Sequence, residues 1–465
     1  MFDIRDDSRV IHFIGLGGIG ISGLAEILHS IGYKIQGSDC YHSQNIDRLE
    51  RLGITAFIGH DKTYVENAGI VVYSSAIKKD NPELIRAREL RIPCLTRAEM
   101  LAQIVRLKKS IVVAGSHGKT TVTSICASIL EMASMSPTVI NGGIINAYKT
   151  NAKLGDGDWA VVESDESDGS FVTLFPTIGI VTNIDNEHSN HYGSFENLKL
   201  AFKSFLSNLP FYGAGIVCLD DSSIERVVTD MTDRNIITYS ITKDSMFRAI
   251  NIKKTSKGST FDVKTCDNFL KEVHIPLLGD HNILNALAAL ATATELKIDL
   301  EIVKTTLASF SGVGRRFSTI GVVQGITFID DYAHHPTEIR ALLRAAKQKT
   351  NGKILIVCQP HRFTRLITLF KEFCDCFEDA DIIVLTEVYK ADDLETSDIS
   401  SRDLYDALYH SGKNVLFAED ESRVASIVDE SIKNRILTDG DLILFAGAGS
   451  ISKWAHGIYM DLADR

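Results

Sequence analysis

The segment VIHFIGLGGIG, residues 10–20, runs from a strand-like apolar stretch directly into a turn rich in glycine. The same arrangement recurs in SIVVAGSHGKTT, residues 110–121, and in DLILFAGAGS, residues 441–450. A buried strand, then glycines, then a helical pattern is typical of the strand-to-helix turns of parallel sheets. Three such turns in 465 residues agree with a prior of roughly one domain per 150 residues. We therefore expect three domains.

The segments between these turns favour an α/β fold. Near-continuous apolar runs alternate with helical patterns, as expected for strands buried on both faces of a doubly wound sheet. Residues 240–275 differ, because their short alternating runs and polar turns predict antiparallel hairpins. The doublet at 108–109 and the segment at 312–316 suggest domain boundaries. The resulting domains are residues 1–108, 109–313 and 314–465. The predicted buried strands are GIVVYSSA (69–76), WAVVESDE (159–166), TIGIVTNI (177–184), KILIVCQP (353–360) and DIIVLTEV (381–388).

Composition and charge exclude several classes of protein. The formal net charge is −11 and basic residues are interspersed with acidic ones, so no field favours nucleic acid or an anionic membrane. The eight cysteines are scattered without a C-x-x-C pair, which favours reduced thiols over a zinc site. No run of about 18 apolar residues occurs, and the N-terminal residues are acidic, so neither a membrane span nor a signal peptide is expected. We expect a cytoplasmic protein.

The first glycine turn has the spacing Gly15-x-Gly17-x-x-Gly20, which holds a pyrophosphate at the N-terminus of a helix. Asp39 follows at roughly the 20-residue distance where an acidic side chain meets the ribose of NAD. A nicotinamide dehydrogenase is therefore one interpretation of this turn. It leaves the second glycine turn without a role.

The second turn, residues 115–121, has the features of a phosphate loop. Gly115 and Gly118 let backbone N–H groups face phosphate oxygens, Lys119 can reach the terminal phosphates, and the Thr120 hydroxyl can bind Mg²⁺. Val113 stands where the first glycine of the longer phosphate-loop pattern belongs. The turn therefore predicts ATP binding through a shortened loop.

Carboxylates gather after the next predicted strand, in the segment Glu163-Ser-Asp-Glu-Ser-Asp168. The end of a strand that follows a phosphate loop is where a further Mg²⁺ ligand would lie, which favours a metal role for at least one of these side chains. His188, at the end of another predicted strand, could add an imidazole ligand. In the last third of the chain, residues 330–338 and 359–365 crowd ionisable groups after strands, and arginines there suit a carboxylate or a phosphate.

Ten blocks of the sequence, in order, resemble the Mur ligases, the ATP-dependent amide-forming enzymes of peptidoglycan synthesis. The family's phosphate loop is the shorter form, so Val113 is no departure from it. The branch that joins L-alanine to UDP-N-acetylmuramate is the most similar. The blocks are GLGGIGISG, VVYSSAI, GSHGKTT, ESDESDGSF, VTNIDNEH, LGDHNILNALAA, GVGRRF, DDYAHHPTEI, QPHRFTRL and GAGS.

The resemblance implies a Rossmann-like N-terminal domain, a central P-loop ATPase-like domain with a mixed sheet, and a Rossmann-like C-terminal domain. These would bind the UDP-sugar, ATP with Mg²⁺, and the amino acid. The residues implied for the UDP-sugar are Gly15, Gly17, Gly18, Gly20, Ser38, Asp39, Ser74 and Ser75. Those implied for ATP are Gly115, Ser116, His117, Gly118, Lys119, Thr120, Thr121, Asn282, Asn285, Arg315 and Asp331. Those implied for Mg²⁺ are Thr120, Glu163 and His188. Those implied for the amino acid are Tyr332, His334, Arg362 and Arg365. Direct catalytic roles would fall to Lys119, His188, His334 and Arg365.

The expected reaction is the ligation of L-alanine to the lactyl carboxylate of UDP-N-acetylmuramate through an acyl phosphate. Three alternatives stay open at this stage: a ligase of the same family that adds a murein peptide, a dehydrogenase, and a non-enzymatic P-loop switch. Metal roles for Glu166 and for Lys203 are also open, with Lys203 treated as structural because the alanine-adding branch usually lacks the carbamylated lysine of its relatives. We expect a monomer or weak homodimer with no nucleic-acid partner.

Overall fold

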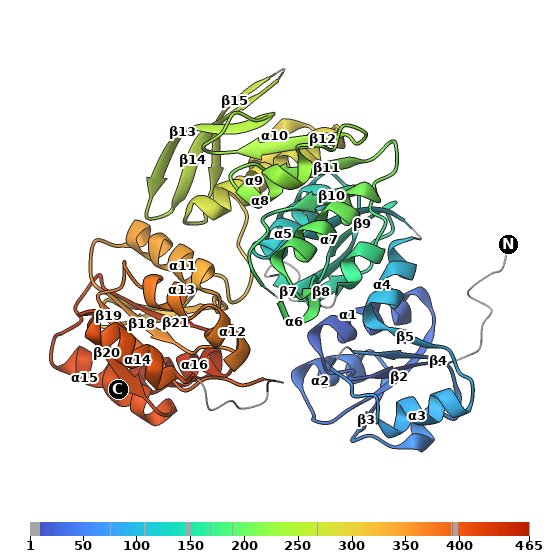
Figure 1. Cartoon of the computed structure of the whole chain (residues 1–465), viewed down its shortest axis with the longest axis horizontal. Helices are drawn as coiled ribbons and strands as arrows, with labels where there is room; N and C mark the ends of the chain where they lie inside the picture. Colours follow the sequence, from blue (N-terminus) through green and yellow to red (C-terminus); the bar gives the residue numbers. More distant parts are fainter. Residues whose placement is uncertain are drawn as a thin grey trace. The chain divides into compact units, whose positions relative to one another are not determined.

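The computed structural model describes residues 10–464, except positions 75, 107, 146–149, 168, 188, 267, 392 and 394–398. The chain separates into two compact units. The first unit contains Met1–Asn251, Asp262–Val273 and Leu284–Ser311, and the second contains Ile252–Phe261, His274–Ile283 and Gly312–Arg465. Within them lie three sheets, flanked by helices (Figure 1).

The N-terminal sheet has parallel strands in the order β3-β2-β1-β4-β5. The direction of winding reverses between β1 and β4, and ligands of such sheets bind beyond the carboxyl ends of the strands at this point. The glycine turn after β1 lies there. The elements are β1 (Val10–Ile14), α1 (Ile19–Ile31), β2 (Lys34–Asp39), α2 (Gln44–Arg51), β3 (Thr55–Ile58), η2 (Lys62–Val65), β4 (Ala68–Tyr73), α3 (Pro82–Glu89), β5 (Cys94–Thr96) and α4 (Arg97–Val105).

The central sheet has ten strands in the order β15-β14-β13-β12-β11-β10-β6-β9-β7-β8. It is mixed, because β7 and β8 pair antiparallel whereas β6 is parallel to both of its neighbours. The buried strand β6 leads into the phosphate loop. The elements are β6 (Lys109–Ala114), α5 (Lys119–Met132), β7 (Thr138–Ile145), β8 (Thr150–Lys153), β9 (Trp159–Glu163), η3 (Ser170–Thr173), β10 (Ile178–Val181), α6 (Ser189–Tyr192), α7 (Phe195–Ser207), β11 (Ala214–Cys218), α8 (Ser222–Val228), β12 (Ile236–Ser240), β13 (Phe247–Thr255), β14 (Gly258–Thr265), β15 (Phe269–Ile275), α9 (Asp280–Glu295) and α10 (Leu300–Ala308).

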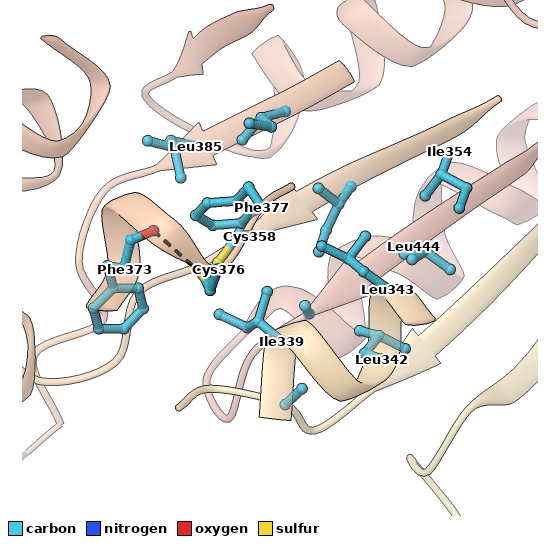
Figure 2. Packing of buried hydrophobic residues seen from close by; sticks show 14 of the residues in the cluster. Ile339, Leu342, Leu343, Ile354, Cys358, Phe373, Cys376, Phe377, Leu385 and Leu444 are labelled. Atoms are coloured by element: carbon cyan, nitrogen blue, oxygen red, sulfur yellow. Dashed lines mark hydrogen bonds between the residues drawn. The ribbon is translucent and has the colours of Figure 1, made fainter. Parts of the chain in front are cut away.

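The C-terminal sheet has the order β16-β17-β21-β18-β19-β20, with β16 antiparallel to β17 and parallel pairing elsewhere. Two apolar clusters pack against it, and Figure 2 shows the one that includes Leu343, Phe373 and Cys376. The Cys376 thiol donates to the Phe373 carbonyl at 3.3 Å. The elements are β16 (Ser318–Val323), β17 (Ile326–Asp331), α11 (Pro336–Lys349), β18 (Ile354–Cys358), α12 (Phe363–Thr368), α13 (Phe370–Asp375), β19 (Ile382–Thr386), α14 (Ser401–His410), β20 (Val415–Ala418), α15 (Glu421–Lys433), β21 (Leu442–Ala446) and α16 (Ile451–Ala463).

The predicted fold class is confirmed, because the chain forms α/β domains with mixed sheets. Each predicted buried strand is present, and the hairpins predicted within residues 240–275 are β13 to β15. The domain limits at 108/109 and 313/314 stay proposals. Among the described residues, no helix has both the length and the apolar character needed to cross a membrane.

Candidate active site

The first glycine turn is built around the N–H group of Gly17. This group donates to the Asp39 carboxylate at 2.8 Å, and the Asn45 side chain donates to the Gly17 carbonyl at 2.8 Å. A Cβ at Gly17 would lie 2.8 Å from the Ser43 hydroxyl, so a larger residue here would displace that side chain. Gly18 caps helix α1 without a side-chain hydrogen bond, and the Ile21 N–H donates back to its carbonyl at 3.1 Å, so the N–H groups that precede Ile21 in the helix are the ones that suit an anion. Asp39 therefore shapes the turn, a role that needs no NAD.

The three serines predicted at the UDP-sugar, Ser38, Ser74 and Ser75, differ in their surroundings. The Ser38 hydroxyl is fully buried and donates to Glu83 at 2.8 Å, so this side chain has a partner inside the fold, and its predicted place at the UDP-sugar stays a proposal. The Ser38 carbonyl accepts the N–H of Gly15, and this hydrogen bond ties the first glycine turn to the end of β2. Ser74 lies beside Gly15, whereas Ser75 is outside the described residues.

The phosphate loop joins β6 to α5. Gly115 and Gly118 have φ values of 132° and 82°, a region that favours glycine. Helix α5 begins at Lys119, and its N-cap Gly118 makes no side-chain cap hydrogen bond. A Cβ at Gly118 would lie 2.8 Å from the Asn285 amide oxygen, so Asn285 stands against the loop. The start of α5, where Thr120 and Thr121 follow, therefore has the geometry of an anion site.

Two residues that follow β10 hold the phosphate loop in place, and the sequence did not reveal their roles. The N–H groups of Ser116 and His117 donate to the Asn183 carbonyl at 3.0 Å and the Asn183 side chain at 2.7 Å. The His117 ring contacts the Asp185 carboxylate at 3.1 Å. Asn183 therefore anchors this side of the loop, and the ATP contacts predicted for Ser116 and His117 stay proposals. Asn183 and Asp185 belong to the VTNIDNEH block after a strand that neighbours β6, which is the signal that could have identified them.

Lys119 is held by carbonyl groups and a carboxylate. Its Nζ donates to the Gly115 carbonyl at 2.5 Å and to Glu166 at 2.9 Å. Burial alone would lower the pKa of Lys119, but the carboxylates of Glu166 and Glu163 outweigh it and raise that pKa. The ammonium group is therefore charged at neutral pH, as phosphate binding requires.

Thr120 and Glu163 bring two oxygen donors together. The Thr120 hydroxyl donates to Glu163 Oε1 at 3.0 Å, and the Gly142 N–H donates to Oε2 at 2.6 Å. Hydroxyl and carboxylate oxygens are hard ligands of the kind that Mg²⁺ prefers, so the pair fits this ion. The third predicted ligand, His188, lies outside the described residues. Lys203 lies within α7, and its structural role stays a prediction.

In the C-terminal domain, Asp331 organises the turn after β17. Its carboxylate oxygens accept the N–H groups of Phe317 at 2.6 Å and Ala333 at 2.7 Å. Burial raises the pKa of Asp331 to about 6. The side chain therefore supports the turn, and its predicted place at the ATP site stays a proposal. Arg315 donates to the Gly447 carbonyl at 2.7 Å and covers the Tyr332 ring at 4.8 Å.

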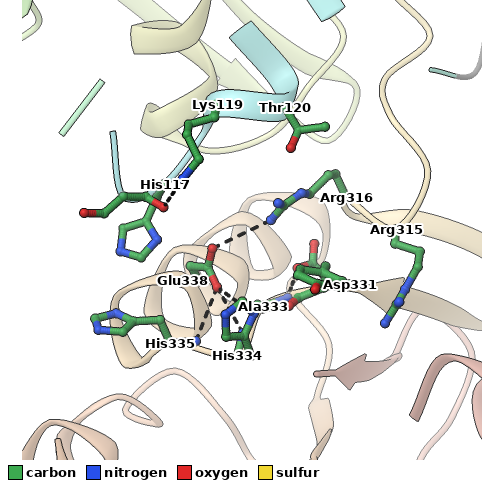
Figure 3. Close-up of polar contacts among 12 residues, drawn as sticks. His117, Lys119, Thr120, Arg315, Arg316, Asp331, Ala333, His334, His335 and Glu338 are labelled. Atoms are coloured by element: carbon green, nitrogen blue, oxygen red, sulfur yellow. Dashed lines mark hydrogen bonds and ion pairs between the residues drawn. The ribbon is translucent and has the colours of Figure 1, made fainter. Parts of the chain in front are cut away.

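Glu338, at the start of α11, accepts hydrogen bonds from the segment that contains His334 (Figure 3). Glu338 accepts the N–H groups of His334 at 3.0 Å and His335 at 3.3 Å, and Arg316 lies 3.7 Å from it. The Nδ1 of His334 lies 2.9 Å from the Tyr332 carbonyl, which can only accept. Nδ1 therefore carries a proton, and in the neutral ring Nε2 is the acceptor.

After β18, Arg362 is the N-cap residue of α12 and Arg365 lies within that helix. Arg365 donates to the His361 carbonyl at 3.0 Å, and its guanidinium also lies 3.3 Å from His361 Nδ1. Burial, together with His334 and the two arginines, lowers the pKa of His361 to about 3. The ring is therefore neutral at pH 7 and does not compete with the arginines for an anion. Arg362 has a φ of 70°, which is strained for an arginine, and in the described part of the chain its buried Nε has no hydrogen-bond partner.

Three family models match the chain in succession. They describe the Mur ligase family catalytic domain at residues 10–109, the Mur ligase middle domain at 113–293, and the Mur ligase glutamate ligase domain at 315–449. The UDP-N-acetylmuramate--L-alanine ligase of Paramagnetospirillum magneticum is 45% identical over 460 residues, 97% of this chain and 96% of that protein.

The chain belongs to the Mur ligase family. Two solved structures relate the fold of this Mur ligase to others. The UDP-N-acetylmuramate-alanine ligase of Thermotoga maritima has a TM-score of 0.83 at 30% identity, covering 98% of this chain and 99% of that one. A murein peptide ligase from Psychrobacter arcticus has a TM-score of 0.72 at 21% identity, with coverage of 98% and 99%. The second likeness concerns the fold alone.

The H-N-x-x-N block of this Mur ligase divides between the two compact units. Asn282 belongs to the second unit, and its side chain donates to the Leu278 carbonyl at 2.7 Å at the start of α9. Asn285 belongs to the first unit and lies against the phosphate loop. The adenine contact predicted for these residues stays a proposal.

The raised pKa of Asp331 leads to a pH-dependent stability. An acid whose folded-state pKa exceeds its unfolded value stabilises the fold fully below the unfolded pKa, near 4, and this contribution is lost as the pH rises through about 6. Asp331→Asn removes the titration. We expect the unfolding free energy of the wild type, relative to the variant, to fall by about 3 kcal/mol from pH 4 to pH 7. Urea unfolding at four pH values measures this. A wild-type unfolding free energy that rises with pH relative to that of the variant would contradict the burial argument.

Proposed function

We propose that this Mur ligase uses ATP to join L-alanine to the lactyl carboxylate of UDP-N-acetylmuramate. The observation that carries the proposal is the 45% identity, over 97% of the chain, to a relative named for that reaction. The phosphate loop with a buried, charged Lys119 supports ATP chemistry, and the glycine turn at Gly17 supports a substrate that carries a pyrophosphate.

The reaction must turn a carboxylate oxygen into a leaving group before an amine can form an amide. The lactyl carboxylate attacks the γ-phosphorus of ATP in line and forms an acyl phosphate, while ADP leaves. Lys119 and the N–H groups at the start of α5 hold the charge that spreads over the transferring oxygens. The amine of L-alanine then attacks the acyl carbon, and the tetrahedral intermediate expels phosphate.

Mg²⁺ would be held by the Thr120 hydroxyl and the Glu163 carboxylate, with His188 as the proposed third ligand. When bound, this ion neutralises phosphate charge. Lys119 performs the same task in our proposal, and Glu166 keeps it protonated and oriented.

Glu163→Gln tests the metal assignment. The amide keeps the shape of the side chain but loses the anionic ligand, so we expect the Mg²⁺ concentration for half-maximal phosphate release to rise by about 10- to 100-fold. Glu131→Gln is the matched control, because Glu131 pairs with Lys153 at 2.6 Å in the same domain. An unchanged Mg²⁺ requirement in Glu163→Gln would place the metal elsewhere.

The amino-acid site is assigned to the turn that carries Arg362 and Arg365. A carboxylate of the incoming alanine needs a fixed cation, and a guanidinium can take it with two parallel hydrogen bonds. The neutral His361 ring accepts from Arg365 and orients it. His334 and Tyr332 complete this end of the site in our proposal, through the contact between the His334 ring and the Tyr332 carbonyl.

The remaining alternatives are separated by one set of assays. Phosphate release is measured with UDP-N-acetylmuramate and, in turn, L-alanine, glycine, L-serine and a murein tripeptide. We expect the highest kcat/KM with L-alanine. A preference for the tripeptide would make the chain a murein peptide ligase, and NADH turnover without phosphate release would make it a dehydrogenase. Sedimentation of the same preparation tests our expectation of a monomer or weak homodimer. We place the enzyme in the cytoplasm.

A further inference from the structure

Cys40, His60 and Glu83 form a chain of contacts beside the first glycine turn. The Cys40 thiol is exposed and lies 3.2 Å from His60 Nε2, and His60 Nδ1 lies 2.6 Å from Glu83 Oε1. A nucleophile next to a base that is itself oriented by a third group is the arrangement that activates nucleophiles in enzymes. None of these three residues has a role in the proposed ligation.

Glu83, the carboxylate in this series of contacts, is held in place by several neighbours. Glu83 is fully buried and also accepts from the Ser38 hydroxyl at 2.8 Å and from His12 Nε2 at 2.5 Å. It lies in the first turn of α3, where the helix dipole favours a negative charge. Gln36 donates to the other nitrogen of His12 at 3.1 Å, so His12 presents its N–H to Glu83.

The position of His60 follows from this fixed acceptor. Because Glu83 accepts, Nδ1 of His60 carries its proton, and in the neutral ring Nε2 presents a lone pair to Cys40. The His60 side chain is 16% exposed, which leaves it little freedom to turn away. The exposed sulfur therefore has a proton acceptor in a fixed orientation.

We propose that Cys40 is an activated thiol and a site of covalent modification by small soft electrophiles such as α-halocarbonyl compounds. His60 Nε2 removes the thiol proton, the sulfur attacks the electrophilic carbon, a C–S bond forms, and the halide leaves with the electrons of the broken carbon–halogen bond. The proton then passes from His60 to solvent. Glu83 orients and stabilises the imidazolium in this step.

Modification has a consequence for the neighbouring turn. Cys40 directly follows Asp39, whose carboxylate holds the Gly17 N–H at 2.8 Å. A group attached to the Cys40 sulfur would crowd the carboxyl end of β2, where the UDP-sugar is placed in our proposed function. We therefore infer that alkylation weakens UDP-N-acetylmuramate binding, and this part rests on the proposed function.

The first experiment measures labelling alone and does not depend on the proposed function. The full chain is treated with iodoacetamide at pH 7, and the modified peptides are quantified over time by mass spectrometry. Cys266, the other cysteine of the described residues that is exposed, directly follows β14 and is the internal reference. We expect Cys40 to be alkylated at least about tenfold faster, because a positioned base contributes about 10²-fold or more. Equal rates would overturn the proposal.

The variant His60→Gln separates activation from exposure. We expect it to bring the Cys40 rate to within about threefold of that of Cys266, while Cys266 itself is unchanged. A folded variant, by its melting curve, that still labels Cys40 at the wild-type rate would contradict the role of His60. If the variant does not fold, the comparison of Cys40 with Cys266 in the wild-type chain still decides the matter.

The second experiment addresses the consequence. Alkylated wild type should show a KM for UDP-N-acetylmuramate raised by about tenfold or more, and alkylated Cys40→Ser should not. Rapid labelling without a change in KM would keep the activated thiol and reject the effect on the UDP-sugar. Loss of ligation in the untreated wild type would instead reject the proposed function.

Discussion

Lys119→Ala is expected to lose ligation while it retains UDP-N-acetylmuramate binding. The Lys119 Nζ is the buried cation of the phosphate loop, held at 2.9 Å from Glu166, and in our proposal it stabilises the transferring phosphoryl group. Removing one preorganised charge of this kind costs about 10²- to 10³-fold in kcat. Phosphate release under saturating substrates measures the loss, and calorimetry measures the affinity for the UDP-sugar.

The substitution also leaves Glu166, which is 3% exposed, without its cation. A buried carboxylate that loses its partner destabilises a fold, so the melting temperature is expected to drop and the assays belong well below it. Lys153→Ala is the matched control, because it removes a lysine that pairs with Glu131 at 2.6 Å in the same domain. Near-normal phosphate release in Lys119→Ala, with the control also active, would remove Lys119 from the mechanism.

Arg365→Ala is expected to raise the KM for L-alanine at least about 30-fold, with kcat much less affected. The reason is the loss of the fixed guanidinium that pairs with the substrate carboxylate, a change that costs about 2 kcal/mol or more. Arg365→Lys keeps the charge but not the two parallel hydrogen bonds, so an intermediate KM is expected. Initial rates over a range of alanine concentrations, at saturating ATP and UDP-sugar, give these values.

Arg402→Ala is the control for Arg365→Ala. Arg402 pairs with Glu419 at 2.8 Å, but both side chains are more than half exposed, at 56% and 57%, so its removal is expected to leave the KM unchanged. If Arg365→Ala has the wild-type KM for alanine, the amino-acid carboxylate binds at another residue. If Arg402→Ala raises the KM as much, the effect reflects general damage to the domain.

The fold could be predicted because its signals are local and continuous. Strands β18 and β19 are uninterrupted apolar runs, buried at every position, and such runs identify strands that are covered on both faces. The phosphate loop could also be predicted, because its two glycines are a signal in the sequence. In the structure, Gly115 and Gly118 have the φ values that only glycine adopts readily. The family assignment made from ten ordered blocks is confirmed by the three family models.

The roles of single polar side chains were harder to predict, because they depend on neighbours that are distant in sequence. Ser38 is expected at the UDP-sugar, and no local pattern predicts that its hydroxyl donates to Glu83, which lies in α3. Asp331 is expected at ATP, and no local pattern predicts that its carboxylate also accepts the backbone N–H group of Phe317, 14 residues earlier in the chain. Asn183 received no role, although it anchors the phosphate loop. Strand ends can be located in a sequence, whereas the direction of each side chain there is set by packing.

The central claim, ligation through an acyl phosphate of the lactyl carboxylate, is tested most directly by oxygen transfer. UDP-N-acetylmuramate labelled with ¹⁸O in that carboxylate is incubated with the enzyme, ATP and L-alanine, and the phosphate released is analysed by mass spectrometry. The mechanism predicts one labelled oxygen in each phosphate, because the bridging oxygen of the acyl phosphate leaves with phosphorus. Release of unlabelled phosphate, while the alanyl product forms, would contradict it.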